Sequence, residues 1–540
     1  ADDRLAADTG VMKVGDAPRL VDVDLSGVRV VTLLLDDGGD TSNGDLANWA
    51  DARFEMAAGG ARPVTYRAPV APVPRLAMGA GEAVAIHGPR VYGATPGRPF
   101  LYRVGATGKG PLRFAARGLP AGLAIDPVSG IVSGAVSRAG TSEVALTVTG
   151  PGGSASRSLR IEAGRDRLAR TPPMGWNSWN VWGTAVDDAK VRAAADWLVR
   201  SGLAAHGYDY VVLDDAWTNG RDAKGELKPN AKFPDMKALA DYIHTRGLKF
   251  GIYSSPGEKT CGGYQGSLGH EAQDAATFAR WGVDFLKHDW CSYDEVAKDR
   301  SLPELKKPYR IMADALAAQD RDIIVNLCQY GYGDVWKWGG EVGGHMWRTT
   351  GDLLDMWANL DSVGFRQAGR EQYVRPGRWN DTDMLVVGPV GWGPNLHPTR
   401  LTPDEQVLHL TLWAMQAAPL FIGADLSRLD PFTIALLTND EVLDVDRDPL
   451  AKAGRPVRRD GRTEVWARRL ADGTRAVALF NRGLAPRRVE VRWSDLGLSG
   501  QQPVRNLWER RDLGAADDSY GVVVPSHGAV MLKIGRGTTA

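Results

Sequence analysis

Hydrophobic positions along the chain follow different periods, and each period predicts a different kind of structure. Near the N-terminus, Val21, Val23 and Leu25 alternate with aspartates, which is typical of a β-strand that buries one face. Beyond Thr171, short apolar runs that end in polar residues alternate with amphipathic segments such as 187–200, where apolar residues recur at helical spacing. Eight such strand-and-helix units over about 275 residues predict a (β/α)8 barrel. After the barrel, strands return without helices, which predicts an antiparallel β domain.

These patterns divide the chain into several domains. A length of 540 residues exceeds what one hydrophobic core supports. One segment is rich in proline and alanine, as extended linkers are, and the short strands with Gly/Pro turns that follow it predict a small β-sandwich, which we interpret as a spacer. The predicted parts are an N-terminal β module (1–62), a linker (63–84), an immunoglobulin-like β-sandwich (85–163), the catalytic barrel (168–453) and a C-terminal antiparallel β-sandwich (454–540).

Composition and charge exclude several classes of function. The 65 basic and 65 acidic residues cancel without long runs of either sign, which argues against nucleic acid or an anionic membrane as the main partner. The sequence has no apolar stretch of about 18 residues, so we expect no membrane span. It also has no His/Cys/Asp cluster with metal-ligand spacing and no Gly-rich phosphate loop, so we expect neither a metal nor a cofactor. The oligomeric state is left open.

Polar residues gather at the predicted carboxyl ends of the barrel strands, where barrel enzymes place their chemistry. In the run 285–291, side-chain alternation puts Lys287 and Asp289 on one strand face and His288 on the other. Carboxylates can accept hydrogen bonds from sugar hydroxyls, and aromatic rings can cover the apolar face of a pyranose. A neutral carbohydrate therefore suits the candidates better than a phosphate or a metal. They are Asp214, Asp215, Asp289, Asp352, Asp383, Lys287, Arg348, Trp176, Trp179, Tyr253 and Trp347.

Seven motifs, in order, resemble those of glycoside hydrolase family 27, the α-galactosidase or melibiase family. The resemblance runs from about residue 168 to the C-terminus. Nearer the N-terminus, 49–53 resembles the end of a carbohydrate-binding module, of which about half is present, and 118–134 resembles immunoglobulin-like modules of bacterial secreted proteins. The seven family motifs are TPPMGWNSW (171–179), LDD (213–215), GIY (251–253), KHD (287–289), WRTTGD (347–352), WNDTDML (379–385) and APLFI (418–422).

The resemblance implies a retaining exo-glycosidase that hydrolyses terminal α-linked galactose by double displacement. Asp289 would be the nucleophile and Asp352 the general acid/base, with their carboxyl groups roughly 5–5.5 Å apart. Lys287 would favour the charged form of Asp289, and other carboxylates and enclosure would raise the pKa of Asp352. The substrate-binding residues that the resemblance implies are Trp179, Asp214, Asp215, Tyr253, Lys287, Gln329, Arg348 and Asp383.

The cysteines and the start of the chain bear on where the protein works. Cys261 and Cys291 match positions that form a disulfide in the family, and Cys328 is expected to be a small buried residue. The chain starts at Ala1 without methionine, as a secreted or periplasmic protein would after signal-peptide removal. A disulfide is compatible with such a compartment.

One departure from the family leaves other activities open. Many α-galactosidases have Cys-Glu-Trp where this chain has Cys328-Gln329-Tyr330, and that glutamate takes the 2-hydroxyl group. Gln329 can still accept a hydrogen bond there. Alternatives within the family are an α-N-acetylgalactosaminidase, which the bulk of Gln329 and Tyr332 disfavours, an isomaltose-releasing dextranase, and a β-L-arabinopyranosidase, which the aspartates at 214–215 disfavour. A non-catalytic sugar-binding barrel is the alternative from another class, and the presence of both predicted catalytic aspartates argues against it.

Overall fold

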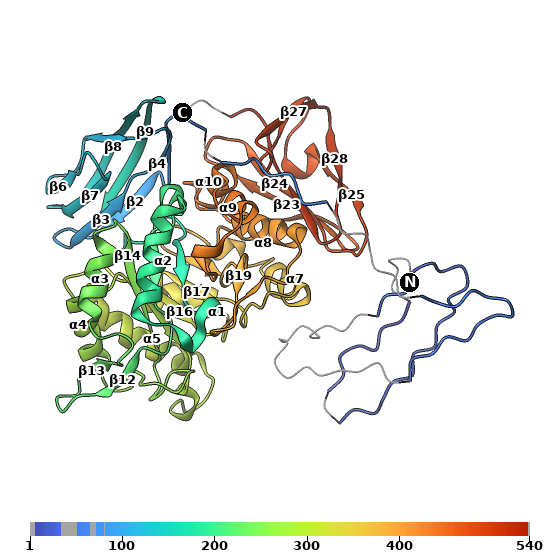
Figure 1. Ribbon diagram of the computed structural model, residues 1–540, viewed down its shortest axis with the longest axis horizontal. Coiled ribbons are helices and arrows are strands. Elements are labelled where there is room, and N and C mark those ends of the chain that lie inside the picture. The colour runs from blue at the N-terminus through green and yellow to red at the C-terminus, as the bar shows by residue number, and fades with distance from the viewer. Residues whose placement is uncertain (1–5, 14, 34–50, 65–71, 80, 538–540) are drawn as a thin grey trace.

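The computed structural model describes residues 6–13, 15–33, 51–64, 72–79 and 81–537 (Figure 1). The first three of these ranges contain no helix or strand, and Leu20 is 93% exposed. The strand expected around Val21, Val23 and Leu25 is therefore absent from the described residues. An alternating pattern forms a stable strand only where neighbouring strands cover its apolar face, and none of the described residues supplies such a strand. Trp49 and Ala50 of the carbohydrate-module motif lie outside the described residues.

The immunoglobulin-like part is a β-sandwich. A four-stranded sheet in the order β2-β9-β8-β5 and a three-stranded sheet in the order β3-β7-β6 enclose a core in which Val144, Val148, Leu159 and Ile161 are fully buried. Alternating side chains along the long strands β8 and β9 supply this core. The strands are β1 Ala85–His87, β2 Val91–Ala94, β3 Pro99–Arg103, β4 Gly105–Thr107, β5 Arg113–Arg117, β6 Leu123–Ile125, β7 Ile131–Ala135, β8 Gly140–Gly150 and β9 Gly153–Ala163.

Eight parallel strands form the central barrel, as the sequence predicts. Their order is β18-β17-β16-β15-β14-β11-β10-β21. The two ends of this sheet meet just beyond β18, where the Leu385 backbone N–H donates to the carbonyl of Phe421 (2.7 Å) and Leu385 pairs in parallel with Ile422. The strands are β10 Met174–Asn177, β11 Tyr210–Val212, β14 Lys249–Ser254, β15 Phe285–Asp289, β16 Ile324–Cys328, β17 Met346–Arg348, β18 Trp379–Asp381 and β21 Leu420–Ile422.

Helices connect the barrel strands and surround them (Figure 1). Helix α2 (Asp188–Arg200) buries Val191, Ala194, Ala195 and Leu198, which confirms the predicted helical spacing, and Asp187 caps its start by accepting from the Lys190 N–H. No described helix is both long enough and apolar enough to cross a membrane. The other helices are α1 Trp179–Trp182, α3 Met236–His244, α4 Glu271–Trp281, α5 Leu302–Ala317, α6 Val335–Trp338, α7 Trp357–Phe365, α8 Pro403–Gln416, α9 Pro431–Leu437, α10 Asp440–Asp446 and α11 Trp493–Leu496.

The C-terminal part is antiparallel β structure packed on helix α8. A six-stranded sheet has the order β22-β23-β24-β29-β26-β27, and β25 pairs with β28. The Trp508 indole donates to the Thr411 hydroxyl of α8 (2.8 Å), and Arg468 donates to the Ala414 carbonyl (2.8 Å). The strands are β22 Arg455–Asp460, β23 Thr463–Arg469, β24 Arg475–Asn481, β25 Arg487–Arg492, β26 Gln502–Asn506, β27 Arg511–Ala516, β28 Ser519–Val524 and β29 Gly528–Ile534. Short two-residue to four-residue strands in the barrel loops are β12 Thr218–Arg221, β13 Leu227–Pro229, β19 Pro389–Val390 and β20 His397–Pro398.

The immunoglobulin-like sandwich, which the sequence analysis interprets as a spacer, is docked on the amino-terminal end of the barrel. Asp322, just before β16, accepts from the Thr95 N–H (2.9 Å) and pairs with Arg98 (3.2 Å). Asp440 binds the Nδ1 atoms of His87 (2.9 Å) and His206 (3.0 Å), one from the sandwich and one from the barrel. These partly buried polar contacts hold the sandwich at the end opposite the predicted site.

Candidate active site

The predicted catalytic residues lie at the carboxyl ends of the barrel strands. Asp289 ends β15, Arg348 ends β17, and Asp214 follows β11 by two positions. The side-chain alternation predicted for β15 is confirmed by the surroundings of His288, which is fully buried and packs edge-on against Tyr309 of α5, outside the sheet. Lys287 and Asp289 thus point away from the helices, toward the barrel interior.

Two tyrosines hold the carboxylate of Asp289. The Tyr253 hydroxyl, from β14, donates to Oδ2 (3.0 Å), and the Tyr330 hydroxyl, from the loop after β16, donates to Oδ1 (2.8 Å). Asp289 is only 5% exposed. Burial raises its pKa to about 6, opposed first by the charge of Lys287 and reinforced by the charge of Asp352. The group predicted to be the nucleophile is therefore fixed in orientation, buried, and ionised above about pH 6.

Lys287 forms its closest ion pair with Asp214 rather than with Asp289. Its Nζ lies 2.8 Å from Oδ2 of Asp214, and the two side chains are 7% and 2% exposed. The same oxygen accepts from the Asn177 amide (2.8 Å), a residue of β10. The charge of Asp214 raises the pKa of Lys287 well above its usual value despite burial, which by itself lowers it, so the lysine stays cationic. Its charge therefore serves both aspartates, as the sequence analysis expected for Asp289.

Arg348 connects the predicted acid/base to a second aspartate. Its guanidinium lies 3.1 Å from Oδ1 of Asp352 and 3.0 Å from Oδ1 of Asp383. Burial raises the pKa of Asp383 to about 6, and its other oxygen accepts from the Leu353 N–H (2.7 Å). Asp352 differs from its neighbours because its side chain is 60% exposed. The enclosure expected around Asp352 is therefore not found in the ligand-free protein, and the loop leaves its carboxyl group open to solvent.

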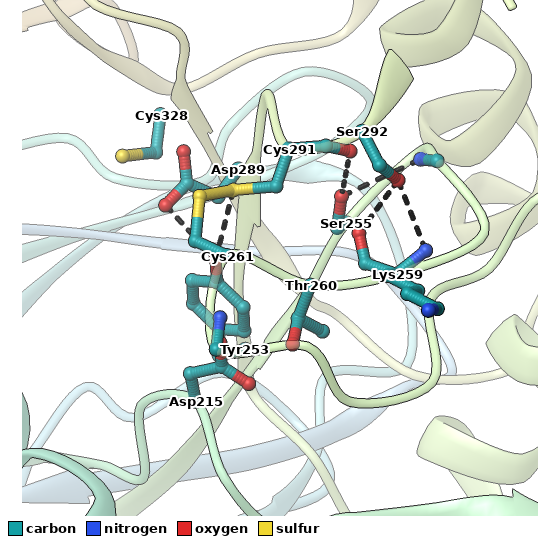
Figure 2. Close-up of a disulfide and its surroundings, with 12 residues drawn as sticks. Asp215, Tyr253, Ser255, Lys259, Thr260, Cys261, Asp289, Cys291, Ser292 and Cys328 are labelled. Carbon is teal, nitrogen blue, oxygen red and sulfur yellow. Dashed lines mark hydrogen bonds between the residues drawn. A yellow bond between two sulfur atoms is a disulfide. The ribbon is translucent and has the colours of Figure 1, made fainter. Parts of the chain in front are cut away.

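The predicted disulfide between Cys261 and Cys291 is confirmed, and it lies beside Asp289 (Figure 2). It ties the loop after β14 to the end of β15. In that loop the Gly262 N–H donates to Oδ2 of Asp215 (2.7 Å), and the Ala216 N–H donates to Oδ1 (2.7 Å). Burial raises the pKa of Asp215, and these hydrogen bonds oppose the rise. The disulfide thus positions the backbone that holds a predicted substrate-binding residue.

The side chain of Gln329, which the sequence analysis expected to bind the sugar, is occupied within its own loop. Its Oε1 accepts from the N–H groups of Gly331 (2.8 Å) and Tyr332 (2.7 Å), and its Nε2 donates to the Tyr332 carbonyl (3.1 Å). The residue is 0% exposed. Both ends of the amide are used to shape its own loop, so Gln329 is not available to a sugar hydroxyl in this structure. The adjacent Tyr330, which the sequence analysis passed over, contacts the nucleophile instead.

The remaining candidates fall into two groups. Trp179, at the start of α1, is partly exposed, whereas Trp176 and Trp347 are buried and their indoles bond to Ala424 and Asn380 within the protein. Cys328 is a free buried thiol, as expected. Trp179 therefore stays a candidate for sugar stacking, and the two buried tryptophans are structural.

A closed barrel with a buried and an exposed carboxylate at its carboxyl end is an arrangement that retaining glycoside hydrolases use, and the comparisons with known proteins place the chain in that class. The alpha galactosidase A family model matches residues 171–448, and the model of the alpha galactosidase C-terminal beta sandwich domain matches 460–534. An NPCBM/NEW2 domain model matches 1–55 and an Ig domain model matches 83–163. The chain belongs to the alpha-galactosidase family, glycoside hydrolase family 27.

Individual relatives agree with this assignment. An alpha-galactosidase from Cyamopsis tetragonoloba is 41% identical over 383 residues, which cover 70% of this chain and 89% of the relative. The crystal structure of alpha-galactosidase I from Mortierella vinacea has a TM-score of 0.63 at 32% identity, covering 70% of this chain and all of that one. A β-L-arabinopyranosidase of family 27 from Geobacillus stearothermophilus, solved with arabinose, has a TM-score of 0.62 at 27% identity, covering 68% of this chain and 98% of that one.

Proposed function

We propose that this enzyme removes terminal α-linked galactose from oligosaccharides or polysaccharides with retention of anomeric configuration. In the first step, an oxygen of Asp289 forms a bond to the anomeric carbon while the glycosidic C–O bond breaks. The leaving oxygen takes the proton of Asp352. The result is a galactosyl ester on Asp289 and a free alcohol, which departs.

The second step releases galactose. Asp352, now a carboxylate, takes a proton from a water molecule whose oxygen attacks the anomeric carbon. The ester bond breaks, the Asp289 carboxylate returns, and Asp352 is again protonated. Two inversions at one carbon give net retention.

The observation that carries this proposal is the contrast between the two carboxyl groups. Asp289 is 5% exposed and held at both oxygens, which orients its carboxylate for attack on one carbon atom. Asp352 is 60% exposed on the loop after β17, where it can reach first a leaving group and then a water molecule. The charge of Asp352 acts on the pKa of Asp289, which places both groups in one electrostatic environment.

Two observations favour galactose over other sugars: the aspartate pair that follows β11, and the similarity of the chain to alpha-galactosidases. Asp214 and Asp215 are both present and buried, and carboxylates at this position can bind the 4- and 6-hydroxyl groups of a hexose. The arabinose-bound neighbour acts on a pentose, which has no 6-hydroxyl. This comparison makes the pentoside the most informative alternative substrate.

Hydrolysis of four nitrophenyl glycosides tests the proposal: the α-galactoside, the α-N-acetylgalactosaminide, the β-L-arabinopyranoside and the isomaltoside. We expect rapid release of nitrophenol from the α-galactoside, and proton NMR should show α-galactose as the first product. Faster hydrolysis of another glycoside would assign a different specificity. Failure to hydrolyse any of them would indicate a sugar-binding protein.

We also propose that the enzyme works outside the cytoplasm. The Cys261–Cys291 disulfide supports this, because structural disulfides persist in oxidising compartments. Fractionation of the source cells, followed by the galactosidase assay, tests it. Activity confined to the cytoplasmic fraction would contradict the proposal.

A further inference from the structure

We propose that Tyr330 is a catalytic residue whose hydroxyl group holds Asp289 in its charged, attacking form, and that Gln329 positions it by clamping the loop after β16. This inference rests on the proposed galactosidase function and adds a group to its mechanism. Tyr330 contacts the reacting carboxylate directly, since its hydroxyl lies 2.8 Å from Oδ1.

The hydroxyl of Tyr330 can act only as a donor toward Asp289. Burial and the neighbouring charge of Asp289 raise the pKa of the Tyr330 phenol above its usual value, so the proton stays on the phenol. A carboxylate accepts such a hydrogen bond in its charged form, which lowers the pKa of Asp289 against the effect of burial. The second tyrosine, Tyr253, occupies the other oxygen. The two together fix the plane of the carboxylate.

The loop is built to bring this hydroxyl to the nucleophile. Tyr330 has a left-handed backbone (φ 63°), which costs a residue with a side chain about 1 kcal/mol and persists only where surrounding contacts enforce it. Gln329 supplies those contacts by accepting from the two N–H groups that follow Tyr330. Gly331 also has a positive φ (92°), and an added Cβ would lie 2.5 Å from the Thr349 carbonyl. The loop therefore sits directly on the segment that leads to Asp352.

Other groups also affect the charge of Asp289, and their effects on its pKa act in two opposite directions. Lys287 favours the charged form, whereas burial and the charges of Asp352 and Asp214 oppose it. The titratable groups that face or influence Asp289 from the surrounding elements are Asp214 after β11, Tyr253 on β14, Lys287 on β15, Tyr309 on α5, Cys328 on β16, Tyr330 after β16 and Asp352 after β17. Like Tyr253 and Tyr309 in this set, Tyr330 can be altered by removing one oxygen atom without changing a charge.

The test compares the pH dependence of kcat/KM for nitrophenyl α-galactoside in the wild type and in Tyr330→Phe. The acid limb in the wild type should lie near pH 6, where the free nucleophile titrates. A hydrogen bond to a charged group corresponds to roughly one to two pH units, so the limb should move up by about that amount in Tyr330→Phe. Gln329→Ala should move it in the same direction by less, because Tyr330 keeps its hydroxyl but loses its clamp.

Tyr332→Phe is the matched control, since it removes a hydroxyl from the same loop without touching Asp289, and its acid limb should coincide with that of the wild type. An acid limb in Tyr330→Phe that also coincides with the wild type would overturn the proposal. Thermal melts check that each variant folds, and Tyr330→Leu serves as a second variant if Tyr330→Phe does not. A wild type that leaves the α-galactoside intact would instead overturn the proposed function and not the role of Tyr330.

Discussion

Removing the charge of Lys287 should lower both the stability and the acid tolerance of the enzyme, and the two effects can be separated. The substitution Lys287→Met keeps the length and apolar character of the side chain. It leaves Asp214 at 2% exposure with a negative charge and without its cation, 2.8 Å from where Nζ was. It also removes the cation that favours the charged form of Asp289.

The size of the stability effect follows from the burial of the pair. Breaking a buried ion pair by removing one partner costs about 3–5 kcal/mol, because the remaining charge stays desolvated. Asp214 keeps hydrogen bonds from Asn177 (2.8 Å) and from the Asp215 N–H (2.9 Å), so we expect the lower end, about 3 kcal/mol. For a domain of this order of size, that corresponds to a fall in Tm of roughly 6–12 °C.

A double-mutant cycle with Asp214→Asn measures the interaction. We expect Lys287→Met with Asp214→Asn to regain about 2 kcal/mol relative to the sum of the single variants, since no orphan charge remains. The acid limb of kcat/KM should stay displaced upward in every variant that lacks Lys287. Calorimetry and pH-rate profiles on the four proteins give both quantities. Additive Tm changes would refute the buried-pair reasoning, and an unmoved acid limb would refute the influence of Lys287 on the nucleophile.

The remaining predictions concern the nucleophile, the disulfide and the docked sandwich. Asp289→Asn should abolish turnover while leaving galactose binding by calorimetry largely intact, and near-normal rates would reject it as the nucleophile. Replacing both Cys261 and Cys291 with alanine should lower the free energy of unfolding by about 3–4 kcal/mol, because the disulfide closes a 30-residue separation. The double substitution should also raise KM, because the Gly262 N–H would no longer be held at Asp215. An unchanged KM would contradict this positioning role of the disulfide. Asp440→Ala should lower the Tm, by the equivalent of about 3 kcal/mol, with kcat/KM unchanged, because it disrupts only the opposite end of the barrel.

The barrel could be predicted from the sequence because its evidence is local. Each strand is a short apolar run that ends in polar residues, and each helix shows its own apolar stripe, as in α2. The period of two along β15 was sufficient to put Lys287 and Asp289 on one face and His288 on the other. The barrel fold fixes where its strands end, so the candidate residues on β15 and β17 could be placed from the sequence alone.

The direction of a loop side chain could not be predicted in the same way. Gln329 follows the end of β16 directly, and its sequence position suggested a sugar contact. Its side chain turns instead to the two N–H groups of a left-handed turn, and no periodic pattern encodes that turn. The signal that could have directed attention to Tyr330 is its phenol, which can donate to a carboxylate without carrying charge, as the phenol of Tyr332 in the same loop also can.

The docking of the sandwich was missed for a related reason. His87 and Asp440 are distant in the sequence, and neither lies in a recognisable motif, yet they meet at 2.9 Å across two domains. Contacts between domains depend on the shapes of two folded surfaces. The spacing of apolar residues within one segment does not predict those shapes. At the N-terminus, by contrast, the local pattern predicted a strand that the described residues do not form. Val21 and Val23 alternate with polar residues, but no described strand pairs with this segment.

Lys287 and the hydrogen bond from Tyr330 favour the ionised Asp289 that the first step of the mechanism needs, whereas burial and the charges of Asp352 and Asp214 oppose it. The charge of Asp352 raises the pKa of Asp289, so that contribution disappears when Asp352 carries a proton. Two ionised carboxylates repel each other, so the charge of Asp352 opposes the ionised form of Asp289. Tyr330 and Lys287 act on Asp289 in the same direction. It follows that removing Tyr330 or Lys287 raises the pKa of Asp289 and narrows the active pH range from its acid side.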